Sequence, residues 1–152
     1  RGGSPTLKWP NDVLFHGKKT GGILCESKIS GKAVQSMVVG IGINVNETEL
    51  DCPDELKETA TSLSIESGHT HQRELVAAIF TTFFEQYWDR LQESPEEIIN
   101  DWTSLCGHLG KLVSFNFKGE HLSGIFEKID QNGHACINID GQDQKFPAII
   151  LN

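Results

Sequence analysis

The sequence lacks the features by which membrane and exported proteins are recognised. No apolar run approaches the roughly 20 residues that a membrane-spanning helix needs. The first ten residues, RGGSPTLKWP, contain no apolar stretch of the kind that signal peptides carry. We therefore expect a cytoplasmic protein that does not enter a membrane.

Cysteine pairs at metal-binding spacing are also missing. The chain has four cysteines, but they lie far apart, with no CxxC pair and no nearby histidine at zinc-ligand spacing. We expect reduced thiols and no metal site. The cysteines are Cys25, Cys52, Cys106 and Cys136.

Positive charge is scarce overall, since 13 basic residues face 21 acidic ones and the net charge is -8. This balance argues against general nucleic-acid binding. Residues 1–32 differ, because they hold six basic residues and only two acidic ones. A local positive region suits a small polyanion such as a nucleotide. The alternative is that surface charges are merely scattered unevenly.

The chain of 152 residues, 38% of them hydrophobic, is large enough for a packed core. Residues 6–46 predict three strands joined by tight turns at 16–19 and 31–32, which make an antiparallel meander. The nearly unbroken apolar run 36–45 is typical of a strand covered on both faces.

Two helices are expected after the meander. Residues 71–92 place large apolar side chains four apart over a broad face, which predicts a helix packed against the core. Ser94-Pro95-Glu96-Glu97 matches a capping box with proline at the first helical position, so a second helix should run from about Pro95 to Leu105.

From Gly110 the apolar period changes to two, and three glycine turns separate short strands. Strands at this density predict a small β-barrel. The fold class is therefore α+β, with a first domain at 1–106 and a barrel domain at 107–152. The strands are expected at 111–117, 121–129, 134–139 and 143–150.

The chain has no Walker A motif, and its glycine pair is not a Rossmann fingerprint. Gly40 and Gly42 are followed by Val45 where the third glycine belongs, and no helix pattern opens there. Glycine inside a strand can still mark close approach of a ligand, and Asn44 at the strand end offers a donor and an acceptor. The alternative is a core strand that ends in a turn asparagine.

Lys19 and Asp12 are the candidates for chemistry. Lys19 lies at a turn beside two glycines, where its ammonium could reach phosphate oxygens over open backbone. Asp12 lies seven residues earlier on the same hairpin, so both could flank one cavity. The alternative is a surface lysine and a turn-forming aspartate.

Three motifs in register resemble those of biotin protein ligases. They are KWPNDV, KTGGILCE and VVGIGINVN, which occur in this order with short spacers. Residues 8–12 match the KWPND signature, and Gly40 to Asn44 match the G-x-G-I-N strand end. Lys19, Gly22, Leu24 and Glu26 match the K-x-x-G-x-L-x-E segment. The Thr61-Ser62-Leu63 triplet, the aromatic helix and the small barrel also follow the family's order.

The resemblance implies an activity, cosubstrates and a partner. Biotin protein ligases make biotinyl-5'-AMP from biotin and MgATP, and then pass biotin to a lysine of a biotin carboxyl carrier domain. The family fold is a class II synthetase-like domain followed by an SH3-like barrel. Lys19 would contact the biotin carboxylate and the α-phosphate, and Asp12 would orient reacting groups and help to accept the incoming lysine's proton.

The resemblance also implies the binding residues. Asn44 would contact the nucleotide, while Trp9 and Asn11 would shape the ATP side of the pocket. The full set of expected nucleotide- and substrate-binding residues is Lys8, Trp9, Asn11, Gly22, Gly42 and Asn44.

The sequence departs from the family in one respect. The family's glycine- and arginine-rich biotin-binding loop lies well before KWPND, and Arg1-Gly2-Gly3 is only a faint echo of it. Three alternatives follow: a fragment or truncated ligase, a shortened protein whose loop comes from another subunit, or a non-catalytic module that binds nucleotide or a carrier domain. Open sheet edges predict a homo-oligomer formed through the sheet.

Overall fold

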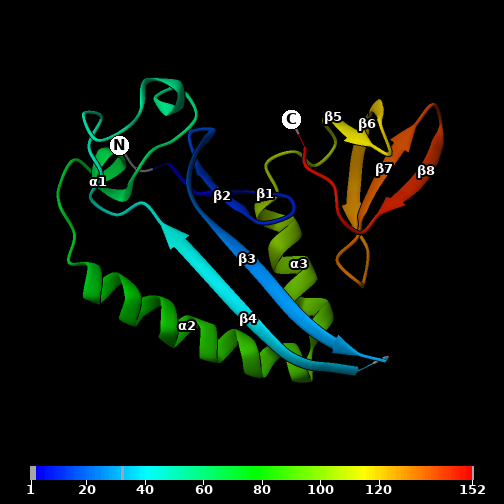
Figure 1. The fold of residues 1–152 in the computed structure, drawn as a ribbon, viewed down its shortest axis with the longest axis horizontal. Coiled ribbons are helices and arrows are strands. Elements are labelled where there is room, and N and C mark those ends of the chain that lie inside the picture. Colours follow the sequence, from blue (N-terminus) through cyan, green and yellow to red (C-terminus); the bar gives the residue numbers. More distant parts are fainter. Residues whose placement is uncertain (1–2, 32, 152) are drawn as a thin grey trace. The chain divides into compact units, whose positions relative to one another are not determined.

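The computed structural model describes residues 3–31 and 33–151 (Figure 1). The chain divides into two compact units, which we describe separately. The first comprises residues up to 5 and 11–72, and the second comprises residues 6–10 and 73 onward. The domain boundary expected near residue 107 stays a prediction.

The first unit is built on the expected antiparallel meander. Strands β2 (Asp12–Phe15), β3 (Lys18–Ser30) and β4 (Ala33–Ile43) pair in this order. The turn between β2 and β3 holds His16 at φ 48° and Gly17 at φ 80°, a left-handed pair that suits a tight hairpin. In Figure 1, β3 and β4 run side by side as the longest strands.

The apolar run in β4 is not covered as the sequence predicts. Met37 is 51% exposed and Val38 66% exposed, and none of the β4 residues is buried. The neighbouring strand β3 also exposes an apolar side chain, because Leu24 is 62% exposed. The prediction of a strand buried on both faces is therefore wrong within the described residues.

A polar segment and a short helix follow β4. A 3-10 turn, η1 (Asp54–Leu56), and the helix α1 (Leu63–Ser67) interrupt the segment 44–72. The Ser62 hydroxyl accepts a hydrogen bond from the Ile65 amide, and Gly68 ends α1 in the left-handed region at φ 80°.

The second unit contains the two predicted helices, α2 (Arg73–Glu93) and α3 (Pro95–Leu105). The limits of α3 agree with the prediction, but the capping box is wrong. The Ser94 side chain makes no cap bond, because the Glu97 amide bonds to the Ser94 carbonyl and the Glu97 carboxylate pairs with Arg90.

The aromatic face of α2 is also exposed, contrary to the prediction that it packs into the core. No described α2 residue is buried, and Phe83 and Trp88 are 56% and 47% exposed. Amphipathic spacing identifies the helix but does not decide what covers its apolar face.

The core of the second unit lies in its antiparallel sheet β5 (Leu112–Phe117), β6 (Glu120–Ile129), β7 (Ala135–Ile139) and β8 (Gln142–Phe146). Phe115, Phe126 and Ile137 are fully buried there, and Phe115 packs edge-on against Phe146. The predicted glycine turns are confirmed. The fold is thus α+β with antiparallel sheets, and the SH3-like closure stays a prediction.

In the second unit, the surroundings of His108 disfavour its protonated form. Its ring packs edge-on against Phe126 at 4.3 Å between centroids, and its Nε2 is buried without a hydrogen-bond partner. Burial, aided by the charges of Lys8 and Lys111, lowers the pKa of His108 from 6.5 to about 4. The folded protein therefore holds this imidazole neutral.

We predict that acid destabilises the protein through His108. Between pH 6.5 and about 4, His108 is protonated in the unfolded chain but stays neutral in the folded chain. The free energy of unfolding therefore falls as the pH falls. The slope is at most about 1.4 kcal/mol per pH unit, and smaller because the ring is only half-buried. Urea unfolding at pH 7 and pH 4.5 measures it. His108→Phe should lose stability less steeply, and equal slopes would contradict the assignment.

Candidate functional site

Lys19 and Asp12 meet because the β2–β3 ladder contains an extra residue. Asp12 pairs with Gly22 and Val13 with Gly21, but Leu14 pairs with Lys19, so Thr20 has no partner on β2. A bulge of this kind reverses the alternation of the side chains that follow it. The Lys19 side chain therefore lies on the same face of the sheet as Asp12 and Gly22. With regular alternation it would point to the opposite face.

The pair itself is a close ion contact at the surface of the first unit. The Lys19 Nζ lies 2.5 Å from the Asp12 Oδ1, and the two side chains are 50% and 23% exposed. An exposed pair of this kind contributes little to stability, with a typical value under about 1 kcal/mol. Both groups remain open to solvent and to a ligand.

Two glycines make the surface around this pair. A Cβ on Gly22 would lie 3.1 Å from the Asp12 Oδ1 and 3.2 Å from the Lys19 Nζ, so a side chain there would press on the pair. Gly42 pairs directly with Gly22, and a Cβ there would meet nothing within 4 Å. Directly opposed residues share a face of a sheet. The Lys19 ammonium thus stands beside open backbone.

Asn11 is fixed against the same strand. Its side-chain amide donates to the Ile23 carbonyl at 2.5 Å, and its own carbonyl accepts from the Ile23 amide at 3.0 Å. These two bonds hold the residue that precedes Asp12 against β3. The structure therefore brings together Lys19, Asp12, Asn11, Gly22 and Gly42.

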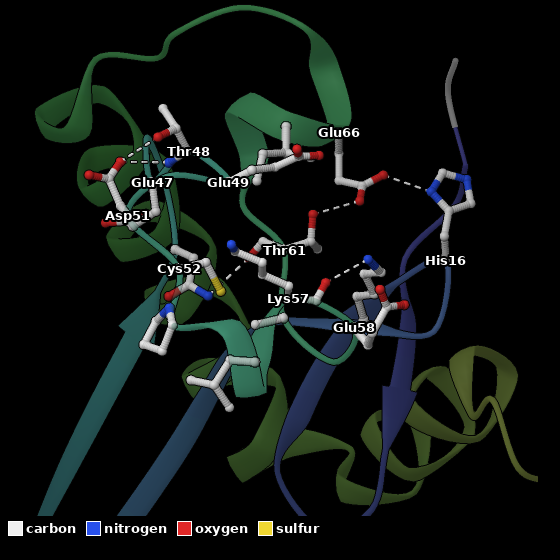
Figure 2. A pocket seen from close by; sticks show the side chains of 16 residues that line it. His16, Glu47, Thr48, Glu49, Asp51, Cys52, Lys57, Glu58, Thr61 and Glu66 are labelled. Carbon is white, nitrogen blue, oxygen red and sulfur yellow. Dashed lines mark hydrogen bonds and ion pairs between the residues drawn. The ribbon is translucent and has the colours of Figure 1, made fainter.

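Asn44 lies in a pocket of about 450 Å³ that neither Lys19 nor Asp12 lines (Figure 2). Its side-chain amide donates to the Thr61 carbonyl at 2.9 Å. The pocket and the Lys19 face are neighbours, because Lys18 lines the pocket and the Thr61 amide bonds to the Lys19 carbonyl at 2.9 Å.

The pocket wall is acidic with an apolar part. The carboxylates that line it are Glu47, Glu49, Asp51, Glu58 and Glu66, against the two ammonium groups of Lys18 and Lys57. The apolar lining comes from Pro53, Leu56, Ala60 and Ile65. A wall of this sign disfavours a polyphosphate.

Lys8 and Trp9 belong to the second unit. Trp9 is 4% exposed, and its indole Nε1 donates to the Gly133 carbonyl at 3.0 Å. In the structure Trp9 therefore packs with the core of the second sheet. The expected contribution of Lys8 and Trp9 to a nucleotide site stays a prediction.

Sequence reasoning missed Glu66 and His16. The Glu66 carboxylate accepts from the Thr61 hydroxyl at 2.7 Å, and its other oxygen lies 2.6 Å from His16 Nδ1. The hydrogen bond from Thr61 lowers the pKa of Glu66. Neither residue falls in the quoted motifs, so no sequence signal marked them.

The described residues contain no group of three or more histidine, cysteine, aspartate or glutamate side chains that could hold a metal ion. All four cysteines are free. No helix in the part of the chain that the structure describes is long and apolar enough to cross a membrane.

Comparison with known proteins identifies relatives. Residues 2–44 match the model of the biotin/lipoate A/B protein ligase family. The bifunctional ligase/repressor BirA of Bacillus spizizenii is 40% identical over 121 residues, which are 79% of this chain and 36% of that protein. The biotin–[acetyl-CoA-carboxylase] ligase of Paracoccus denitrificans is 31% identical over 144 residues, 93% of this chain and 60% of that protein. The chain is similar to biotin protein ligases over most of its own length.

Solved biotin protein ligases share the fold. The ligase of Aquifex aeolicus in complex with biotin and ATP superposes with a TM-score of 0.82 at 28% identity, covering 97% of this chain and 62% of that one. Its apo structure gives 0.84, with 65% of that chain covered. The chain therefore spans roughly one to two thirds of the length of the ligases described here.

We predict that Gly22→Ala separates the Lys19–Asp12 pair without unfolding the protein. The new methyl group would press on both charged groups, and the half-exposed lysine can move away. The free energy of unfolding should change by no more than about 1 kcal/mol. The carbon-13 shift of the Asp12 carboxylate reports the separation. Gly42→Ala is the matched control, and an equal shift in both variants would contradict the geometry.

Proposed function

We propose that this chain provides the nucleotide-binding and catalytic face of a biotin protein ligase. The single observation that carries the proposal is the Lys19 ammonium, which stands beside Asp12 and Gly22, next to the uncovered backbone of Gly42. The Aquifex aeolicus ligase, whose structure holds biotin and ATP, has a similar fold. By this proposal ATP and biotin meet at Lys19.

In the first step, an oxygen of the biotin carboxylate attacks the α-phosphorus of ATP. The bond from that phosphorus to the β-phosphate oxygen breaks, and pyrophosphate leaves with the electron pair. Negative charge grows on the α-phosphate oxygens as the bond forms, and the Lys19 ammonium stabilises it. Mg²⁺ would enter bound to the phosphates, since this ion is usually held by substrate phosphates with one or two carboxylates.

In the second step, the amine nitrogen of a carrier-domain lysine attacks the acyl carbon of biotinyl-5'-AMP. The bond from that carbon to the phosphate oxygen breaks, and AMP leaves. The nitrogen gives up a proton as the amide forms, and the Asp12 carboxylate is the acceptor. Its partial exposure leaves an approach for the incoming amine.

The acidic pocket suits the base of the nucleotide rather than its phosphates. Asn44 lies on its wall and can read a base edge, while the phosphates would extend toward Lys19. Gly22 and Gly42 would allow the ligand to lie close to the backbone. In this arrangement Asn44, Lys19 and the two glycines would all contact the same bound nucleotide.

A non-catalytic module that binds nucleotide or a carrier domain is the second candidate. The observation that favours it is the pocket at Asn44, which neither Lys19 nor Asp12 lines, so a nucleotide base could bind there without the charged pair. Such a module would bind MgATP or a carrier domain without forming an adenylate. Both candidates act on the same partner class, and the expected cytoplasmic location stays a prediction.

We predict that Lys19→Ala abolishes biotin-dependent exchange of pyrophosphate into ATP. Loss of one preorganised charge at a developing oxyanion lowers rates by about 100- to 1000-fold. The 152-residue chain is assayed with biotin, MgATP and labelled pyrophosphate. Lys28→Ala, an exposed lysine on the same strand, is the matched control. Exchange that persists in Lys19→Ala would refute the catalytic role, and a folded wild type without exchange would favour the module.

We also predict a homo-oligomer that forms through the sheet of the first unit. Strand β4 ends the sheet order and exposes apolar side chains together with unpaired backbone groups. Light scattering at rising concentration should give a mass above the 16.8 kDa of one chain. A constant monomer mass would contradict this prediction.

A further inference from the structure

A chain of hydrogen bonds joins the predicted nucleotide residue to the hairpin that carries the catalytic pair. It begins at Asn44, whose side-chain amide donates to the Thr61 carbonyl at 2.9 Å. The Thr61 hydroxyl donates to Glu66 at 2.7 Å, and the second Glu66 oxygen lies 2.6 Å from His16 Nδ1. Figure 2 shows Glu66 between Thr61 and His16.

Each end of this chain lies at a functional element. His16 occupies the turn between β2 and β3, the strands that bring Asp12 and Lys19 together. Thr61 also binds the catalytic strand directly, because its amide donates to the Lys19 carbonyl at 2.9 Å. One residue thus holds both the Lys19 backbone and the Asn44 side chain.

The side chains that form these hydrogen bonds are largely shielded from solvent. Thr61 is only 4% exposed, and the Glu66 side chain is 16% exposed. A buried hydroxyl without a hydrogen-bond partner is disfavoured, so Thr61 would have to move if Glu66 were removed. Its carbonyl, which orients the Asn44 amide, would move with it.

We infer that Glu66 is a positioning residue, which holds Thr61 so that the Thr61 carbonyl fixes the Asn44 carboxamide for the nucleotide. The role in nucleotide binding rests on the proposed function. The charged groups that face Glu66 are His16 on the hairpin turn and Lys18 on β3, and both favour its carboxylate form. Lys18 donates to the Lys57 carbonyl at 2.8 Å, which leaves His16 as the direct partner.

The test compares Glu66→Ala with Glu66→Gln in the full chain. Glutamine keeps an acceptor oxygen for Thr61, whereas alanine removes it. Loss of one hydrogen bond should weaken MgATP binding, measured by calorimetry with biotin present, by about three- to tenfold in Glu66→Ala. Glu66→Gln should restore most of the affinity. Glu55→Ala, an exposed acid on η1 outside the pocket, controls for net charge.

A second readout does not depend on ligand binding. The nitrogen-15 resonance of the Asn44 side-chain amide should shift in Glu66→Ala and stay close to wild type in Glu66→Gln and Glu55→Ala. A shifted resonance with weaker MgATP binding supports the positioning role. Unchanged affinity in a Glu66→Ala protein that binds MgATP overturns it, and so does an unchanged Asn44 resonance.

The two readouts also separate this inference from the proposed function. If the folded wild type binds no MgATP, the proposed function fails, and the Asn44 resonance alone then decides whether Glu66 positions the carboxamide. If Lys19→Ala abolishes pyrophosphate exchange and Glu66→Ala weakens MgATP binding, both assignments stand.

Discussion

The bulge at Thr20 is the constraint on which the site depends. In a regular ladder, Lys19 and Gly22 would point to opposite faces of β3, because they are three residues apart. Thr20, which has no partner on β2, shifts the alternation by one residue, and Lys19 joins Asp12 on the open face. Thr20 itself is 2% exposed, so the extra residue is packed into the unit. A single inserted position thus decides whether an ammonium reaches the ligand face.

The glycines of β3 and β4 follow from the same geometry. Once Lys19 and Asp12 share a face with Gly22, a side chain at that position would push them apart, and the facing Gly42 leaves the neighbouring backbone uncovered. The sheet therefore offers charge and open backbone at one place. Phosphate and carboxylate groups, which are compact and anionic, are the ligands that such a surface accommodates.

Local patterns predicted much of this structure, and long-range contacts account for what they missed. The turns at His16-Gly17 and at the glycines between the later strands, such as Asp140-Gly141, depend on backbone conformations that a few residues dictate, and they are confirmed. The motif residues Lys19, Asp12 and Gly22 do come together. The bulge at Thr20 was not predictable, because no residue type marks it. The exposure of Phe83 and Met37 could not be deduced either, since periodicity shows which face is apolar but not what packs against it.

Thr61 links the two halves of the proposed site. Its amide holds the Lys19 strand, its carbonyl holds Asn44, and its hydroxyl is held by Glu66. A ligand that touched both Lys19 and Asn44 would therefore bind groups whose spacing is set by one buried residue. The entropy lost in arranging those groups is already lost on folding, which is the physical meaning of a preorganised site. The segment 44–62 therefore does more than line a pocket. It fixes the distance between the Lys19 ammonium and the Asn44 carboxamide, the two groups that the nucleotide would bridge.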